Sequence, residues 1–160
     1  LCTELLMLSE ITDNPFDATT MLEAELVSGR AAERFGRMVH SLGGPIDLIE
    51  KPDKYLSKAE VIKPVHLQET GFVSNIDTRA LGMAVVELGG GRIRAEDDID
   101  FAVGLSDFIT IGKSSDRAIA TIHARTEADW EQAAEKIKKA ITVSDSAPAQ
   151  SPVIHQTIST

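Results

Sequence analysis

The chain has 160 residues, enough for one domain or for one domain and part of another. A hydrophobic share of 42% is enough for a core, and a charged share of 26% is ordinary for a soluble protein. The formal net charge of -9 argues against nonspecific binding to nucleic acid and to anionic membranes, since both need positive charge. No run of about 18 apolar residues occurs, so no membrane span is expected.

The N-terminal segment begins without a methionine or a helix start signal. Leu1, Leu5 and Leu8 form one helical stripe that no capping residue precedes, which is typical of a helix cut in its middle. Because Cys2 is the single cysteine, no internal disulfide can form, which suits a reducing cytoplasm. We therefore expect a cytoplasmic protein.

Two helices are predicted next. Asn14-Pro15 is a helix start, because asparagine can cap and proline fits the first turn. Leu22 and Leu26 then share a face, and Gly29 breaks the run. The second helix ends at Gly43-Gly44-Pro45, and its apolar residues recur at helical spacing: Ala32, Phe35, Val39 and Leu42. A short turn between two short helices predicts antiparallel packing.

The segment from Pro45 to Ser57 is predicted to be an irregular connector, because it holds two prolines and several charges. It divides the chain into a helical part, residues 1–56, and a second part, residues 57–160. Strand-forming residues begin there with Val61 to Leu67, where Pro64 favours an edge strand or a bulge.

The stretch from Gly71 to Gly112 is predicted to contain a strand, a short helix, a charged loop and a second strand. Asp77 can cap the helix, and Gly89-Gly90-Gly91 can end it, because glycine enters the left-handed conformation without a steric penalty. The apolar residues of the helix fall on one face: Leu81, Ala84, Val85 and Leu88. In the charged loop from Arg92 to Asp100, Asp97 or Asp98 is a candidate to pair with Arg92 or Arg94.

The last third is predicted as a strand over 118–124 and a helix that begins at Thr126, with Asp129 at the capping-box position. Glu135 and Lys139 are spaced for an ion pair within that helix. The helix has an apolar face: Trp130, Ala133, Ala134, Ile137 and Ile141. A polar turn over 113–117 precedes the strand, and a final strand is possible over 153–158.

Catalytic and metal-binding motifs are absent from the sequence. The four histidines, His40, His66, His123 and His155, lie outside any zinc-binding pattern, and one cysteine cannot build a thiolate site. We interpret all four as structural, with a position facing a cleft as the alternative for His123. We therefore assign no catalytic, cofactor-binding or metal-binding residue in this chain.

The candidate binding element is Gly89-Gly90-Gly91-Arg92. Its backbone amides and arginine could close over a phosphate or a sugar, whereas the simpler interpretation is a helix C-cap and turn. Both hold if the loop from Gly89 to Asp100 is a lid hinged at its glycines, and that is our hypothesis. The acidic cluster Glu96-Asp97-Asp98 with Asp100 lacks the spacing of a calcium loop and is interpreted as solvated.

Several segments resemble one enzyme family, in the same order along nearly the whole chain. AAERFGRMVHSLGGP, GFVSNIDTRALGMAVVELGGGR, DDIDFAVG and IATIHA are similar to the C-terminal part of the pyrimidine-nucleoside phosphorylases. The resemblance implies an α+β chain: the helical tail of a large α/β domain over residues 1–56, then an α/β-hammerhead-like C-terminal domain over 57–160.

The resemblance also implies an activity. These enzymes reversibly convert thymidine and phosphate to thymine and 2-deoxy-α-D-ribose 1-phosphate, as homodimers and without an organic cofactor. The family's glycine-rich phosphate loop of K-x-S type and its pyrimidine-binding Arg/Ser/Lys set are not found in this chain. The resemblance thus implies a C-terminal fragment that is inactive by itself, with thymidine and phosphate as ligands of the complete enzyme.

Two other classes remain as alternatives. A hammerhead-type carrier module would present a modified lysine, and Lys113 is the only lysine near a suitable turn, although its Gly-Lys-Ser context is a poor match. A purely structural helical adaptor would leave the stretch from Gly71 to Gly112 unexplained.

Overall fold

The computed structural model describes residues 1–149, 156 and 158 of the chain. Contacts between residues divide the chain into two compact units, Leu1–Leu56 and Ser57–Thr160. The chain combines helices with small antiparallel sheets, so the predicted α+β class is confirmed. Which larger domain the first unit belongs to stays a prediction. The strand suggested over 153–158 lies almost wholly outside the described residues.

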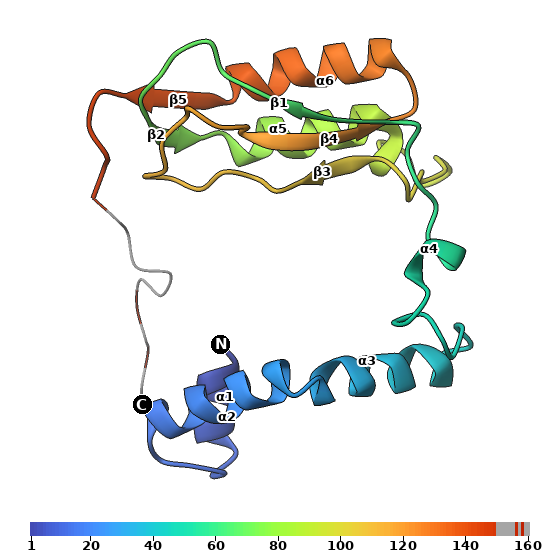
Figure 1. The fold of residues 1–160 in the computed structure, drawn as a ribbon, viewed down its shortest axis with the longest axis vertical. Helices are drawn as coiled ribbons and strands as arrows, with labels where there is room; N and C mark the ends of the chain where they lie inside the picture. Colours follow the sequence, from blue (N-terminus) through green and yellow to red (C-terminus); the bar gives the residue numbers. More distant parts are fainter. Residues whose placement is uncertain (150–155, 157, 159–160) are drawn as a thin grey trace. The chain divides into compact units, whose positions relative to one another are not determined.

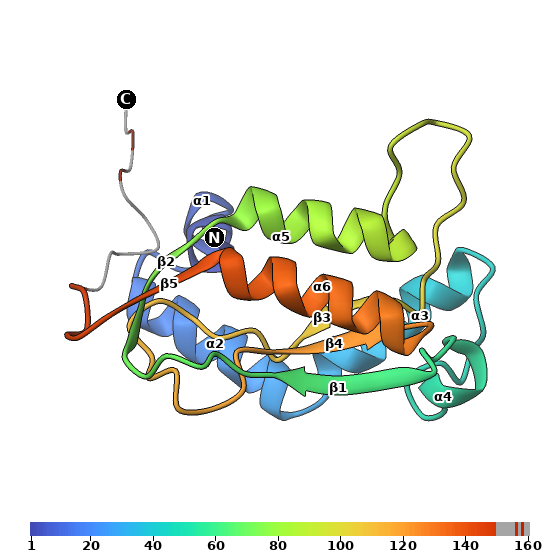
Figure 2. The ribbon, with the colours of Figure 1, turned by 90° about the horizontal axis from the view of Figure 1, so that it is seen from above.

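The regular elements of the first unit are all helices. Asn14 begins α2 as predicted, because its side-chain oxygen accepts a hydrogen bond of 2.9 Å from the amide of Phe16. The unit contains four helices: α1 (Cys2–Leu8), α2 (Pro15–Val27), α3 (Arg30–Ser41) and the single turn α4 (Pro52–Tyr55). Helix α1 packs on α2, whereas α3 continues away from the end of α2 (Figures 1 and 2). The antiparallel pair predicted for α2 and α3 is wrong, because α3 runs on from the end of α2 after Ser28 and Gly29 and does not fold back along it (Figure 1).

The first unit has almost no core of its own. Ala18 is its only buried residue, and the structure describes every residue from 1 to 56. The predicted stripe of Leu1, Leu5 and Leu8 is exposed. Exposed apolar helix faces of this kind are expected where a segment packs against further protein.

The second unit is built from two antiparallel sheets and two helices. A three-stranded sheet has the order β1–β4–β3, and a two-stranded sheet pairs β2 with β5. The strands are β1 (Val61–Val65), β2 (Phe72–Ile76), β3 (Gly104–Ser106), β4 (Ala120–Ala124) and β5 (Ile141–Ser144). The helical elements are α5 (Thr78–Val85), the wider turn η1 (Val86–Gly90) and α6 (Glu127–Lys139). Helix α6 packs against β4 and β1, and α5 lies beside α6 (Figures 1 and 2).

The core of the second unit follows the predicted patterns. Alternate residues of β4, namely Ala120, Ile122 and Ala124, are buried. They form one cluster with Ile137 of α6 and Ala84 of α5. Burial of these apolar side chains is the main stabilising term for the unit. No helix among the described residues is long and apolar enough to cross a membrane.

The local signals at element ends are confirmed. Strand β1 is an edge strand, which explains how Pro64 is tolerated opposite Thr121. Thr126 caps α6 by accepting a 3.1 Å bond from the amide of Asp129. The Asp129 carboxylate accepts from the hydroxyl of Thr126, so the reciprocal half of the capping box is absent from this pair.

Two predictions in this unit are corrected by the structure. The second strand predicted between Gly104 and Gly112 is shorter than expected and covers only Gly104 to Ser106. It ends there because Asp107 has a left-handed φ of 51°, which interrupts the extended conformation. Glu135 pairs with Lys138 at 3.1 Å, one residue nearer than the predicted partner, Lys139.

Candidate functional site

The segment that joins α5 to β3 carries the candidate site. Asp77 caps α5 as predicted, and its carboxylate accepts a 2.9 Å bond from the amide of Ala80. Ala84 is buried, and Leu81 and Leu88 pack against the core, so the apolar face fixes the helix on the unit. The loop therefore leaves from a helix end whose position is set by packing.

The helix ends at the three glycines, and each has a structural reason. Gly89 has a φ of 97°, the left-handed conformation predicted for the C-cap. A Cβ on Gly90 would lie 3.2 Å from the carbonyl oxygen of Val85 and 3.3 Å from that of Val103. A Cβ on Gly91 would lie 2.7 Å from the Val86 side chain. The turn therefore needs glycine at Gly89 for its backbone conformation and at Gly90 and Gly91 for lack of space.

The loop from Gly89 to Asp100 is closed at its base and projects from the end of α5 (Figure 2). The amide of Asp100 donates a 2.8 Å bond to the carbonyl oxygen of Gly89. Within the loop, one carboxylate oxygen of Asp97 accepts bonds from the amides of Ile93 (3.0 Å) and Arg94 (2.8 Å). Asp97 was a candidate partner for an arginine side chain, and here it binds the backbone instead.

Arg125, directly after β4, holds the base of the loop. Its Nε and Nη2 donate to the two carboxylate oxygens of Asp100, at 2.5 and 2.7 Å. This bidentate hydrogen bonding, aided by the amide of Ala102, lowers the pKa of the Asp100 carboxyl below its ordinary value. The third donor, Nη1, reaches the carbonyl oxygen of Lys58 at 3.3 Å. Sequence reasoning missed Arg125, because a single arginine after a strand carries no signal of its partner.

Arg92 and Arg94 are the loop's cationic side chains, and both are exposed. Exposed guanidinium groups on a loop of fixed base can contact an anion such as phosphate. Ile93 between them is also exposed. The arrangement is therefore suited to contact a ligand or a protein surface outside this unit.

A comparison with known families finds a similarity in this part of the chain. Residues 72–144 match the family model described as the pyrimidine nucleoside phosphorylase C-terminal domain. Over these residues the chain is similar to that family. The match extends from β2 to β5 and includes the whole loop, whereas residues 1–71 lie outside it.

The histidines are not brought together by the fold. In the second unit, His123 on β4 is bonded through Nε2 to the hydroxyl of Ser106 on β3, at 2.9 Å. His66 follows β1 and is exposed, and His40 lies on α3 of the other unit. His155 lies outside the described residues. Among the residues that the structure describes, no group of three or more His, Cys, Asp or Glu is arranged for a metal ion.

Lys113 does not stand at a free hairpin tip. Its carbonyl oxygen accepts a 3.0 Å bond from the amide of Val73, and the amide of Gly112 donates to the carbonyl oxygen of Val73 at 2.8 Å. The amide of Ser115 donates to Gly71 at 2.9 Å. These bonds tie the backbone of the segment to β2, and the side chain of Lys113 is exposed.

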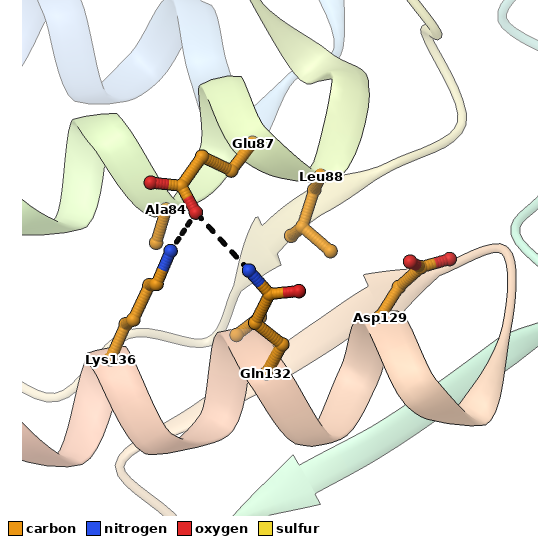
Figure 3. A pocket seen from close by; sticks show the side chains of 7 residues that line it. Ala84, Glu87, Leu88, Asp129, Gln132 and Lys136 are labelled. Atoms are coloured by element: carbon orange, nitrogen blue, oxygen red, sulfur yellow. Dashed lines mark hydrogen bonds and ion pairs between the residues drawn. The ribbon is translucent and has the colours of Figure 1, made fainter.

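A small hollow between α5 and α6 does not form a binding site (Figure 3). Glu87 reaches across it to an ion pair with Lys136 and accepts a 3.5 Å bond from the side-chain amide of Gln132. The hollow has a volume of about 10 Å³, the lower limit for one water molecule. It is a seam at which polar side chains join the two helices.

Proposed function

We propose that this chain is the C-terminal part of a thymidine phosphorylase. The proposed reaction is the reversible phosphorolysis of thymidine. A phosphate oxygen forms a bond to the anomeric carbon as the bond from that carbon to the base nitrogen breaks. Thymine leaves with a proton, and the sugar becomes 2-deoxy-α-D-ribose 1-phosphate.

The match of residues 72–144 to the family's C-terminal domain is the observation that supports this proposal. The family acts on pyrimidine nucleosides, and the choice of thymidine rests on the resemblance of the sequence segments. We assign no catalytic residue to this chain. Positioning of the phosphate and of the nucleoside, which supplies much of the rate in such reactions, is assigned to the rest of the enzyme.

The proposed contribution of this chain is the loop from Gly89 to Asp100. Arg92 and Arg94 place two exposed guanidinium groups in a loop whose four carboxylates leave it with a net charge of -2 (+2 - 4), so any contact with an anionic substrate would be a local one made by these two side chains. We further propose that the enzyme is a cytoplasmic homodimer with phosphate as its co-substrate and no organic cofactor.

The proposal is tested by assaying the complete protein that contains this sequence. Release of thymine from thymidine should require phosphate and should be faster than release of uracil from uridine. The 160-residue chain alone should show no turnover. Phosphate-dependent cleavage of uridine but not thymidine would overturn the specificity, and the absence of any nucleoside cleavage would overturn the function.

A separate measurement tests the carrier alternative. In the protein isolated from its source, the peptide that contains Lys113 should have the mass calculated from its sequence. A mass increase located on Lys113 would favour a carrier module over a phosphorylase.

A further inference from the structure

One guanidinium group joins three separate parts of the second unit. Arg125 binds both carboxylate oxygens of Asp100 and, through its remaining terminal nitrogen, the carbonyl oxygen of Lys58. The backbone amide of Asp100 closes the loop by donating a hydrogen bond to the carbonyl oxygen of Gly89. Its carboxylate holds the next turn by accepting a 3.0 Å hydrogen bond from the amide of Ala102. Lys58 is the second residue after the boundary between the two units.

We propose that Arg125 is a positioning residue that joins the base of the loop to the chain at the unit boundary. The loop from Gly89 to Asp100 then moves together with that boundary segment, as an arm of fixed base. It is not a lid hinged at its glycines. This inference rests on the proposed function in one respect, namely that the loop has a substrate to contact.

The packing of the glycines supports the fixed base. A hinge needs backbone freedom, but the space beside this backbone is small: a Cβ on Gly90 would meet two carbonyl oxygens within 3.3 Å, and a Cβ on Gly91 would meet the Val86 side chain at 2.7 Å. The hydrogen bond between Asp100 and Gly89 would have to break before the loop could rotate about these residues. Rotation would also separate Asp100 from Arg125, and bidentate bonds between charged groups are among the stronger side-chain interactions.

The geometry also explains why the partner is an arginine. Two parallel donors reach one carboxylate, and a third donor remains for a carbonyl on another segment. The Asp100 side chain is 27% exposed and that of Arg125 41% exposed, so both are partly screened from water. A lysine could keep the charge, but it could not hold both partners in this arrangement.

The test is hydrogen exchange in the complete protein, read at two peptides distant in sequence. One peptide covers the loop base at Asp100–Ala102, and the other covers residues 57–62. In Asp100→Asn and Arg125→Gln, we expect exchange about threefold faster or more in both peptides. Arg125→Lys should have a smaller effect than Arg125→Gln.

Asp97→Asn is the matched control, because Asp97 lies in the same loop and its carboxylate accepts hydrogen bonds from the nearby amides of Ile93 and Arg94. It should speed exchange at Ile93 and Arg94 and leave residues 57–62 unchanged. If Asp100→Asn also leaves residues 57–62 unchanged, the joining role of Arg125 is wrong. If it leaves the loop base unchanged, the fixed base is wrong.

Hydrogen exchange is measured without substrate. A negative result in this experiment therefore concerns the role of Arg125 alone, whereas a negative phosphorolysis assay concerns the proposed function. Unchanged exchange in α6 shows that a variant has kept its fold. A general loss of stability would instead raise exchange in α6 as well and would contradict a specific positioning role.

Discussion

Replacing Gly90 by alanine is expected to destabilise the second unit, whereas the same change at Gly82 should stabilise it. Gly82 is exposed inside α5, and no atom outside its own helix lies within 4 Å of its added Cβ. Alanine there gains about 1 kcal/mol of helix propensity. At Gly90 the Cβ meets the Val85 side chain at 2.9 Å and two carbonyl oxygens within 3.3 Å. Overpacking against backbone atoms costs about 1–3 kcal/mol.

The two variants should therefore differ by about 2–4 kcal/mol in free energy of unfolding. Trp130 is the only tryptophan and lies on α6, so its fluorescence during urea unfolding reports on this unit. In a thermal scan, each kcal/mol corresponds to a shift of about 4–8 °C for a domain of roughly this size.

A Gly90→Ala protein as stable as the unmodified one would refute the packing argument. The triple glycine would then be free to serve as a hinge, and the lid hypothesis would regain its physical basis. A failure of Gly82→Ala to stabilise would instead concern α5 alone, since no close contact is involved at that site.

Three further predictions concern the same unit. Ile137→Ala removes a side chain with no exposed surface and should cost about 2–5 kcal/mol, whereas Met83→Ala, 42% exposed, should cost much less in the same urea unfolding measurement. Thr126→Ala should cost about 1 kcal/mol through loss of the cap of α6, and Thr126→Ser should retain most of that stability; equal loss in both would contradict the capping role. Because Arg125 lowers the pKa of Asp100 in the folded state, the stabilisation from this carboxylate is present above its unfolded pKa of about 4 and is lost as pH falls through the lower folded value. After correction for intrinsic exchange, the amide of Ala102 in the unmodified protein should therefore exchange faster below about pH 4 than above it. Asp100→Asn, which has no carboxyl group to titrate at this position, should lack this change. Identical pH profiles in the two proteins would contradict the prediction.

Helix starts could be predicted from the sequence because a cap involves only neighbouring residues. Asn14, Asp77 and Thr126 each accept a bond from an amide two or three residues onward. The pairing partner of a cap is fixed by the helix itself, so residue type and position are sufficient. The edge position of β1 was accessible for a similar reason, since Pro64 lacks the amide that a central strand needs.

Interactions between distant segments could not be predicted in this way. Asp100 and Arg125 are separated by 25 residues, and Lys58 by a further 42 from Asp100, so no local pattern relates them. The end of β3 depends on Asp107, whose left-handed conformation aspartate tolerates but does not require. The relation of α2 to α3 depends on the two residues Ser28 and Gly29, whose spacing suits a turn as well as a simple change of direction.

The three glycines show how one sequence signal can have several physical causes. The sequence indicates only that a helix ends there. The structure requires glycine at Gly89 for its backbone conformation, and at Gly90 and Gly91 for close contact with the preceding turn. Since two of the three positions are required for contact, flexibility does not explain them. The placement of Arg92 and Arg94 then depends on the fixed base at Asp100, and through Arg125 on the chain at Lys58.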